Sequence, residues 1–247
     1  MKFIFFSFKR SSFLYKMKFL LPILCVFTLV NAFDNIFLEP KSPAQAKFKK
    51  VFNSKESNII INVGAAGTGK TLFTCQEAIA NVINKNMNHI ILARPCVSVD
   101  NEQIGFLPGD LKEKMDPWMK PCMDYFKPFV DKNNALLKKI EVCPIAYMRG
   151  RTFDNSVIIV EEAQNTTPVQ MKLILTRIGK DSKIVINGDL SQSDIRSLNG
   201  LQDLMNRFSL YYQNEEELNK DGFHIIKYDS EHVLRNPIIK KIDAMYQ

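Results

Sequence analysis

Glycine, proline, cysteine and histidine are all sparse in this sequence, and each scarcity excludes a class of protein. With 10 glycines and 11 prolines among 247 residues, the chain is neither collagen-like nor a low-complexity linker. The three histidines lack the spacing of a metal site. Four of the five cysteines lie outside the first 32 residues, with no CxxC pair: Cys75, Cys96, Cys122 and Cys143. We expect unpaired, buried thiols in a reducing compartment rather than a disulfide scaffold.

Acidic residues are also in the minority, with 26 against 33 basic residues, and the net charge of +7 at first suggests a nucleic-acid-binding protein. Residues 1–32 hold five of the basic residues and no acidic one. Without them the balance falls to 28 basic and 26 acidic residues, or +2. The body of the chain therefore makes only a mild electrostatic case for binding nucleic acid.

The apolar run near the N-terminus, residues 19–30, is twelve residues long, which is too short to cross a bilayer comfortably. It suits the core of a signal peptide, because lysines precede it and short residues follow it as at a cleavage point. Met17 is a second candidate start for this leader. We predict a targeting leader over residues 1–33 and a domain over 34–247 that is not embedded in a membrane. An N-terminal membrane anchor is the alternative.

Phe33 directly follows the expected cleavage point. This arrangement resembles the Phe-led start of bipartite targeting sequences in algae with secondary plastids, which reach the plastid through the secretory entrance. A signal-like leader on a body suited to a reducing compartment fits that route. We therefore expect a plastid location, with secretion, mitochondrial import and membrane anchoring as alternatives.

After residue 57, short apolar segments alternate with segments of helical pattern. Strands are expected at 58–63, 89–93, 157–160, 183–187 and 223–228. Helices are expected at 45–52, 70–84, 110–123 (interrupted by prolines), 168–178, 200–208 and 237–246, with loops at 131–134 and 213–222. This alternation predicts an α/β fold of one lobe, in which helices cover both faces of a parallel sheet.

One glycine-rich segment fits the pattern GxxxxGK[ST] and lies between an expected strand and an expected helix. Its residues are Gly64, Ala65, Ala66, Gly67, Thr68, Gly69, Lys70 and Thr71. The glycines let backbone N–H groups wrap a phosphate, and the helix N-terminus adds its positive dipole end. We expect Lys70 to reach the β- and γ-phosphates and the Thr71 hydroxyl to bind Mg²⁺.

Carboxylates follow two of the other expected strands. Glu161 and Glu162 come directly after 157–160, where the carboxyl end of a parallel strand faces the ligand. We expect Glu161 to help hold Mg²⁺ through its water shell and Glu162 to orient or activate the attacking water. Asp189 and Gln192 follow the strand 183–187 and are expected to sense the γ-phosphate or that water. An exposed acidic turn and an ordinary Gly-Asp turn are the alternatives.

Together these segments resemble the PhoH family of P-loop ATPases, which is related to superfamily-one helicase cores. The resemblance rests on 64–71 (GAAGTGKT), 93–97 (ARPCV), 105–121 (GFLPGDLKEKMDPWMKP), 146–179 (with RGRTF and EEAQNTTP) and 187–194 (NGDLSQSD), and more weakly on 230–239. It implies ATP binding and Mg²⁺-dependent hydrolysis on a RecA-like core, a homo-oligomer, and work on RNA or an RNA–protein complex.

The sequence departs from the family pattern at two positions. Glu161 stands where Asp is usual, and Asn187 stands where Thr is usual. The extra methylene of Glu161 moves its carboxylate, which bears on Mg²⁺ geometry and on the rate of turnover. A second hypothesis therefore stays open: a low-turnover, ATP-dependent regulatory switch whose nucleotide state controls partner binding. Gln164 and Asn165 are candidates to relay that state to a partner surface.

Several single residues are weaker candidates. Gln45 lies upstream of the glycine-rich segment, much as helicases place an adenine-reading glutamine; a surface glutamine is the alternative. Arg149, Arg151 and Arg235 are candidates for an arginine that reaches the γ-phosphate of a neighbouring subunit, or for structural ion pairs. Arg94 is a candidate contact to phosphate or RNA.

Overall fold

The structure is a computed structural model that describes residues 33, 35–95, 111–195, 197–229 and 245, with only the backbone described at 111–118. The chain divides into two units, Met1–Leu38 and Glu39–Gln247. The fold below is that of the second unit, so the boundary expected at residue 33 stays a prediction. Within the described ranges, no helix is both long enough and apolar enough to cross a bilayer.

Six parallel strands form one sheet in the order β3-β2-β4-β5-β1-β6. Their bounds are β1 Ile59–Gly64, β2 His89–Ala93, β3 Ile140–Val142, β4 Ser156–Val160, β5 Lys183–Gly188 and β6 Phe223–Tyr228. The parallel sheet and five of its strands confirm the prediction from sequence. The edge strand β3 was not expected, because three residues with a central glutamate are too short to show a strand period.

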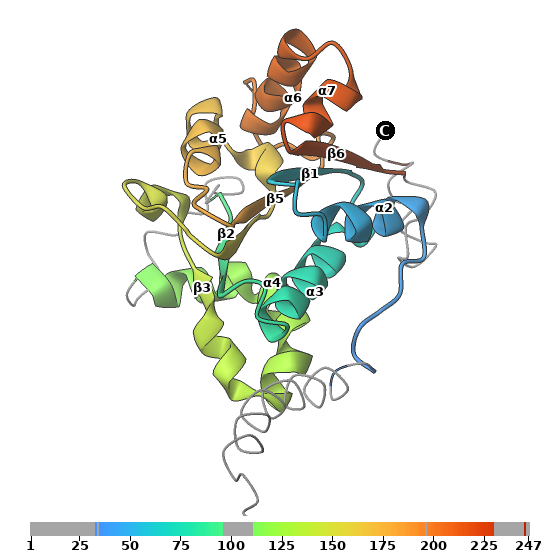
Figure 1. The fold of residues 1–247 in the computed structure, drawn as a ribbon. Helices are drawn as coiled ribbons and strands as arrows, with labels where there is room; N and C mark the ends of the chain where they lie inside the picture. The colour runs from blue at the N-terminus through green and yellow to red at the C-terminus, as the bar shows by residue number, and fades with distance from the viewer. Residues whose placement is uncertain (1–32, 34, 96–110, 196, 230–244, 246–247) are drawn as a thin grey trace, which may run out of the picture. The chain divides into compact units, whose positions relative to one another are not determined.

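Helices lie on both sides of this sheet, as predicted (Figure 1). Figure 1 shows α5 and α6 on one side and α2, α3 and α4 on the other. The bounds are α2 Pro43–Phe52, α3 Lys70–Ile83, α4 Leu111–Lys132, α5 Pro168–Leu175, α6 Gly200–Tyr211 and α7 Glu215–Lys220, with 3₁₀ turns η2 Asn134–Lys139, η3 Ile145–Met148 and η4 Ala163–Asn165. The architecture is therefore a single α/β lobe, as predicted.

Two segments fold differently from the expectation. The helix α4 is not broken by its prolines but continues into the expected loop at 131–134, because Met119, Cys122, Phe126 and Phe129 form a buried stripe and α4 packs on α3. The expected acidic loop at 213–222 contains α7, which Asn214 caps by accepting a hydrogen bond from the Glu217 amide. Packing and capping thus override the local pattern.

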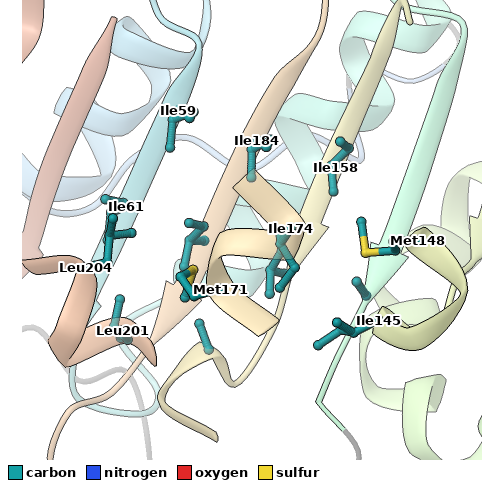
Figure 2. Close-up of a cluster of buried hydrophobic side chains, with 14 of the residues drawn as sticks. Ile59, Ile61, Ile145, Met148, Ile158, Met171, Ile174, Ile184, Leu201 and Leu204 are labelled. Carbon is teal, nitrogen blue, oxygen red and sulfur yellow. The ribbon is translucent and has the colours of Figure 1, made fainter. Parts of the chain in front are cut away.

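The core on the α5–α6 side of the sheet is shown in Figure 2. Side chains from β1, β4 and β5 pack there against α5, α6 and η3; the labelled ones are Ile59, Ile61, Ile145, Met148, Ile158, Met171, Ile174, Ile184, Leu201 and Leu204. Every residue of β4 and β5 is buried, so these strands are fixed from both faces. The described cysteines, Cys75, Cys122 and Cys143, are free and buried as predicted, and Cys96 lies outside the described residues.

Candidate nucleotide-binding site

The glycine-rich loop connects β1 to the first turn of α3. Gly67 and Gly69 have φ of 82° and 89°, in the left-handed region where glycine carries no steric cost. Lys70 Nζ donates to the carbonyls of Gly64 at 2.6 Å and Ala65 at 2.8 Å, which holds the ammonium against the loop. The Thr68 hydroxyl donates to the Ala65 carbonyl at 2.9 Å. Hydrogen bonds within the loop therefore stabilise its conformation and hold the Lys70 ammonium in place.

Gln45 is buried against this loop, so the alternative of a surface glutamine is wrong. Its Nε2 donates to the Thr68 carbonyl at 2.9 Å, and its Oε1 accepts from the Lys41 amide at 2.7 Å. A Cβ at Gly69 would lie 2.9 Å from the same Nε2. Gln45 thus fixes the loop to the start of α2, and its contact with adenine stays a prediction.

The predicted Mg²⁺ residues meet at the ends of β4 and α3. The Thr71 hydroxyl donates to Glu161 Oε2 at 2.8 Å, and Asn187 Nδ2 donates to Glu161 Oε1 at 2.6 Å. Burial raises the pKa of the Glu161 carboxyl, and the hydrogen bonds from Asn187 and Thr71 act in the opposite direction. A hydroxyl and a carboxylate oxygen at this spacing are the hard oxygen donors that Mg²⁺ prefers, so the residues fit that ion.

Glu162 follows in a strained backbone conformation, with φ of 52°. This left-handed conformation costs free energy for a residue that has a side chain. Its Oε2 accepts from Gln164 Nε2 at 2.7 Å, and its Oε1 lies 3.8 Å from Arg94 Nη2. The side chain is 42% exposed, whereas Glu161 is buried. Adjacent glutamates therefore have different surroundings: one is enclosed and the other is open to solvent.

Asp189 lies at the end of β5, as predicted, and is buried. Its Oδ1 accepts from the amide of Ser191 at 3.0 Å and from the hydroxyl at 2.7 Å. No donor reaches its buried Oδ2 from the part of the chain that the structure describes. A buried carboxylate oxygen without a partner is costly unless a ligand or water satisfies it.

Gln164 joins these strand ends, a contact that the sequence did not reveal. Its Nε2 donates to Glu162, its Oε1 accepts from the Asp189 amide at 3.0 Å, and the Gln192 carbonyl lies 3.4 Å from Nε2. Asn165 makes a reciprocal pair with Asp194, at 2.6 and 2.8 Å. The turn after β4 is thereby tied to the turn after β5.

A cavity of about 300 Å³ contains this set of groups. It is lined by Lys70 and Thr71 of the loop, Glu161 and Glu162 after β4, and Asp189 and Gln192 after β5. Tyr125 of α4 also lines it, although nothing in its local sequence marks it. With Ala66, Gly67 and Gly69 of the loop, the structure thus brings nine predicted residues together around one cavity.

The arginine candidates differ in their surroundings. Arg151 forms a two-point ion pair with Glu141, at 2.6 and 3.0 Å, and its guanidinium lies 4.5 Å over the ring of Phe153. Arg149 is exposed beside Gly150, and a Cβ built at that glycine would have no described heavy atom within 4 Å apart from those of its chain neighbours. Arg235 lies outside the described residues. The geometry gives Arg151 the ion pair that was its alternative role and leaves Arg149 accessible.

Comparison with known proteins gives a consistent family. The family described as PhoH-like protein matches residues 37–247. A PhoH-like protein of Bacillus subtilis is 41% identical over 196 residues, covering 78% of this chain and 59% of that protein. Protein PhoH of Escherichia coli K12 is 35% identical over 209 residues, covering 81% and 56%. The chain therefore spans less than two thirds of these relatives' length.

A solved structure supports the fold. The large terminase of a thermophilic bacteriophage, in complex with ADP, superposes with a TM-score of 0.51 at 11% identity. The match covers 84% of this chain and 50% of the terminase chain. At this identity the likeness concerns the fold alone.

Proposed function

The chain belongs to the PhoH-like protein family, and from that premise we propose that it binds ATP with Mg²⁺ and hydrolyses it at the ends of β1, β4 and β5. The observation that carries the proposal is the contact between the Thr71 hydroxyl and Glu161 Oε2, at 2.8 Å, beside a glycine loop that already holds Lys70. The residues that would bind Mg²⁺, the lysine that would bind phosphate and the acidic residues at the strand ends all line one cavity.

The chain's own residues divide the work of binding. The N–H groups of the loop and of the α3 N-terminus bind the phosphates, and Lys70 contacts the β- and γ-phosphate oxygens. Thr71 and Glu161 would hold Mg²⁺, which when bound neutralises charge on the phosphate oxygens. Gln45 keeps the loop in its binding shape through Thr68. These contacts position the γ-phosphate towards Glu162.

Glu162 is the general base in this proposal. Its carboxylate takes a proton from the attacking water, and Gln164 orients it from 2.7 Å. Asp189 presents an unpartnered oxygen to the same region, and Gln192 follows it at the cavity wall. Because Gln164 forms hydrogen bonds at both strand ends, we expect release of the γ-phosphate to change the conformation of the turn after β5.

A low-turnover switch is the second candidate, and the burial of Glu161 favours it. Asn187 and Thr71 hydrogen-bond to its carboxylate and enclose it. Because glutamate is one methylene longer than aspartate, this enclosed carboxylate takes a different position relative to Mg²⁺ than an aspartate would. Steady-state phosphate release separates the two functions. An ATPase releases phosphate repeatedly, whereas a switch binds ATP and releases little unless a partner is added.

We further propose that the protein forms a homo-oligomer and acts on RNA or an RNA–protein complex. The resemblance supports both proposals, and exposed Arg149 supports an arginine that acts on the neighbouring subunit. Mixing Lys70→Ala with Arg149→Ala subunits should recover part of the activity that each variant lacks. Arg151→Ala is the control and should keep its activity without mixing, because Arg151 is paired with Glu141 of its own chain. No recovery in mixed oligomers would contradict the role of Arg149.

The direct test uses protein that starts near Phe33. Phosphate release is measured with and without added RNA, with Lys70→Ala as the control, and native mass gives the assembly. Mg²⁺-dependent release that RNA stimulates would support the proposal in full. Release that RNA leaves unchanged would contradict the RNA part alone, and a monomer in ATP would contradict the shared arginine.

We also propose that residues 1–33 are a targeting leader for a plastid; this rests on the sequence. A reporter that carries residues 1–50 should reach the plastid through the secretory route. Fluorescence in the cytosol would contradict a leader. Accumulation in the secretory pathway, mitochondrion or a membrane would identify the alternative destination.

A further inference from the structure

Glu161 and Asn187 lie in direct contact at the ends of β4 and β5. Asn187 Nδ2 donates to Glu161 Oε1 at 2.6 Å, while Thr71 donates to Oε2 at 2.8 Å. Each oxygen of the carboxylate therefore has one donor, from β5 and from α3 respectively. Since hydrogen bonds to ions are about twice as strong as neutral ones, the amide is a major constraint on where this buried carboxylate lies.

The sheet explains why the two side chains meet. Asn62 of β1 and Asn187 of β5 are register partners, and Val160 of β4 pairs with Ile186. Glu161, the residue after Val160, is therefore level with Asn187. Three polar side chains lie side by side across neighbouring strands at the edge where the ligand binds.

The orientation of the Asn187 amide is fixed by what lies behind it. Its Oδ1 accepts from Asn62 Nδ2 at 2.8 Å, which decides the orientation, because the Thr74 hydroxyl lies 3.2 Å from both Oδ1 and Nδ2 of Asn187. Asn62, Thr74 and Asn187 are all buried, so water does not offer an alternative partner. The reversed amide would set its oxygen against the Glu161 carboxylate. The Nδ2 donor is thus held towards Glu161.

We propose that Asn187 is the positioning residue that fits the longer Glu161 side chain to the Mg²⁺ site, so that these two residues work as a matched pair. The inference rests on the proposed ATP function of the same site. Threonine at 187 would end nearer the backbone and would leave Glu161 Oε1 without its donor. Aspartate at 161 would withdraw its carboxylate from both Asn187 and Thr71.

A double-mutant cycle tests the pairing with a readout other than turnover. The variants are Glu161→Asp, Asn187→Thr and the combination of both, and the probe is Mn²⁺ binding with ADP, followed by electron paramagnetic resonance. Each single variant should weaken Mn²⁺ binding about tenfold, as loss of a partner to a metal ligand commonly does. The double variant should return to within about threefold of wild type, because contacting residues are not additive.

Ile186→Val is the matched control: it shortens a buried β5 side chain next to Asn187, keeps both residues of the pair, and should leave Mn²⁺ binding unchanged. Circular dichroism and urea unfolding check that each variant folds, and Asn187→Ser replaces Asn187→Thr if the latter does not. Additive losses in the double variant would overturn the pairing. Absence of Mn²⁺ binding in the wild type would instead contradict the proposed function itself.

Discussion

Two buried lysines at opposite ends of the sheet's strands make the same contacts but have different surroundings. Lys70 donates to the carbonyls of Gly64 and Ala65, and Lys183 donates to those of Ser54 at 2.6 Å and Ser57 at 2.5 Å. Each ammonium is therefore held by two backbone carbonyls. The local hydrogen bonds alone do not tell which lysine binds a ligand.

The side chains that surround the two lysines distinguish them. Lys70 shares its cavity with Glu161, Glu162 and Asp189. Lys183 lines a cavity of about 530 Å³ in which asparagine and serine side chains predominate, and burial lowers its pKa to about 8. The Lys70 ammonium lies among the carboxylates at the strand ends and the phosphate loop. The Lys183 ammonium holds together the turn before β1 through the carbonyls of Ser54 and Ser57. We interpret Lys70 as functional and Lys183 as structural.

The largest contrast is expected from removing each lysine. Lys70→Ala should lower ATP affinity by on the order of 100-fold, since charge-assisted contacts to the phosphates are lost, and should abolish hydrolysis. Lys183→Met should leave ATP affinity unchanged. A fluorescent ATP analogue titrated into both variants measures this contrast. Retained micromolar affinity in Lys70→Ala would contradict the phosphate-loop assignment.

Glu162→Gln should separate binding from chemistry. The amide keeps the shape of the side chain but does not accept the proton, so kcat should fall by roughly 10²- to 10⁴-fold while ATP affinity stays within a few fold. Phosphate release and equilibrium binding are measured on the same preparation. Unchanged kcat would move the base to another residue, with Glu161 tested next.

Gln164→Ala should have a smaller effect of the same kind. Loss of the 2.7 Å hydrogen bond frees the Glu162 carboxylate, so kcat should fall about tenfold with ATP affinity unchanged. Gln170→Ala, in the exposed capping box of α5, is the matched control and should leave kcat unaltered. A fall in affinity rather than in kcat would indicate that Gln164 supports the fold of the cavity instead.

The last contrast concerns the stability of the fold, through pH and Lys183. Its pKa is about 8 in the folded protein and 10.5 in the unfolded chain, so between these values the unfolded chain binds more protons. The free energy of unfolding should therefore rise with pH across this window, by at most about 1.4 kcal/mol per pH unit from this group. Urea unfolding at pH 8 and pH 10 should show that rise in the wild type and less of it in Lys183→Met. Equal slopes would contradict the burial of a charged lysine.

The sequence predicted what depends on local pattern. The phosphate loop, five strands and the acidic strand ends could be found because motif and hydrophobic run lie in consecutive residues. The contacts of Gln45, Gln164 and Asn187 could not, because each joins elements that the fold brings together. The prolines of α4 misled the prediction because burial against α3 outweighs local propensity. The site's residues were thus predictable, and their mutual support was not.

Calorimetric titration of ATP into the wild type, with Mg²⁺ and again with excess EDTA, tests directly whether this cavity is a Mg²⁺–ATP site. Thr71 and Glu161 meet beside the phosphate loop, so we predict saturable binding near one ATP per chain that weakens at least tenfold without Mg²⁺. The Glu162→Gln variant should show the same binding without the heat of hydrolysis. Binding that is absent, or that is equally tight in EDTA, would contradict the assignment of this cavity as a Mg²⁺–ATP site.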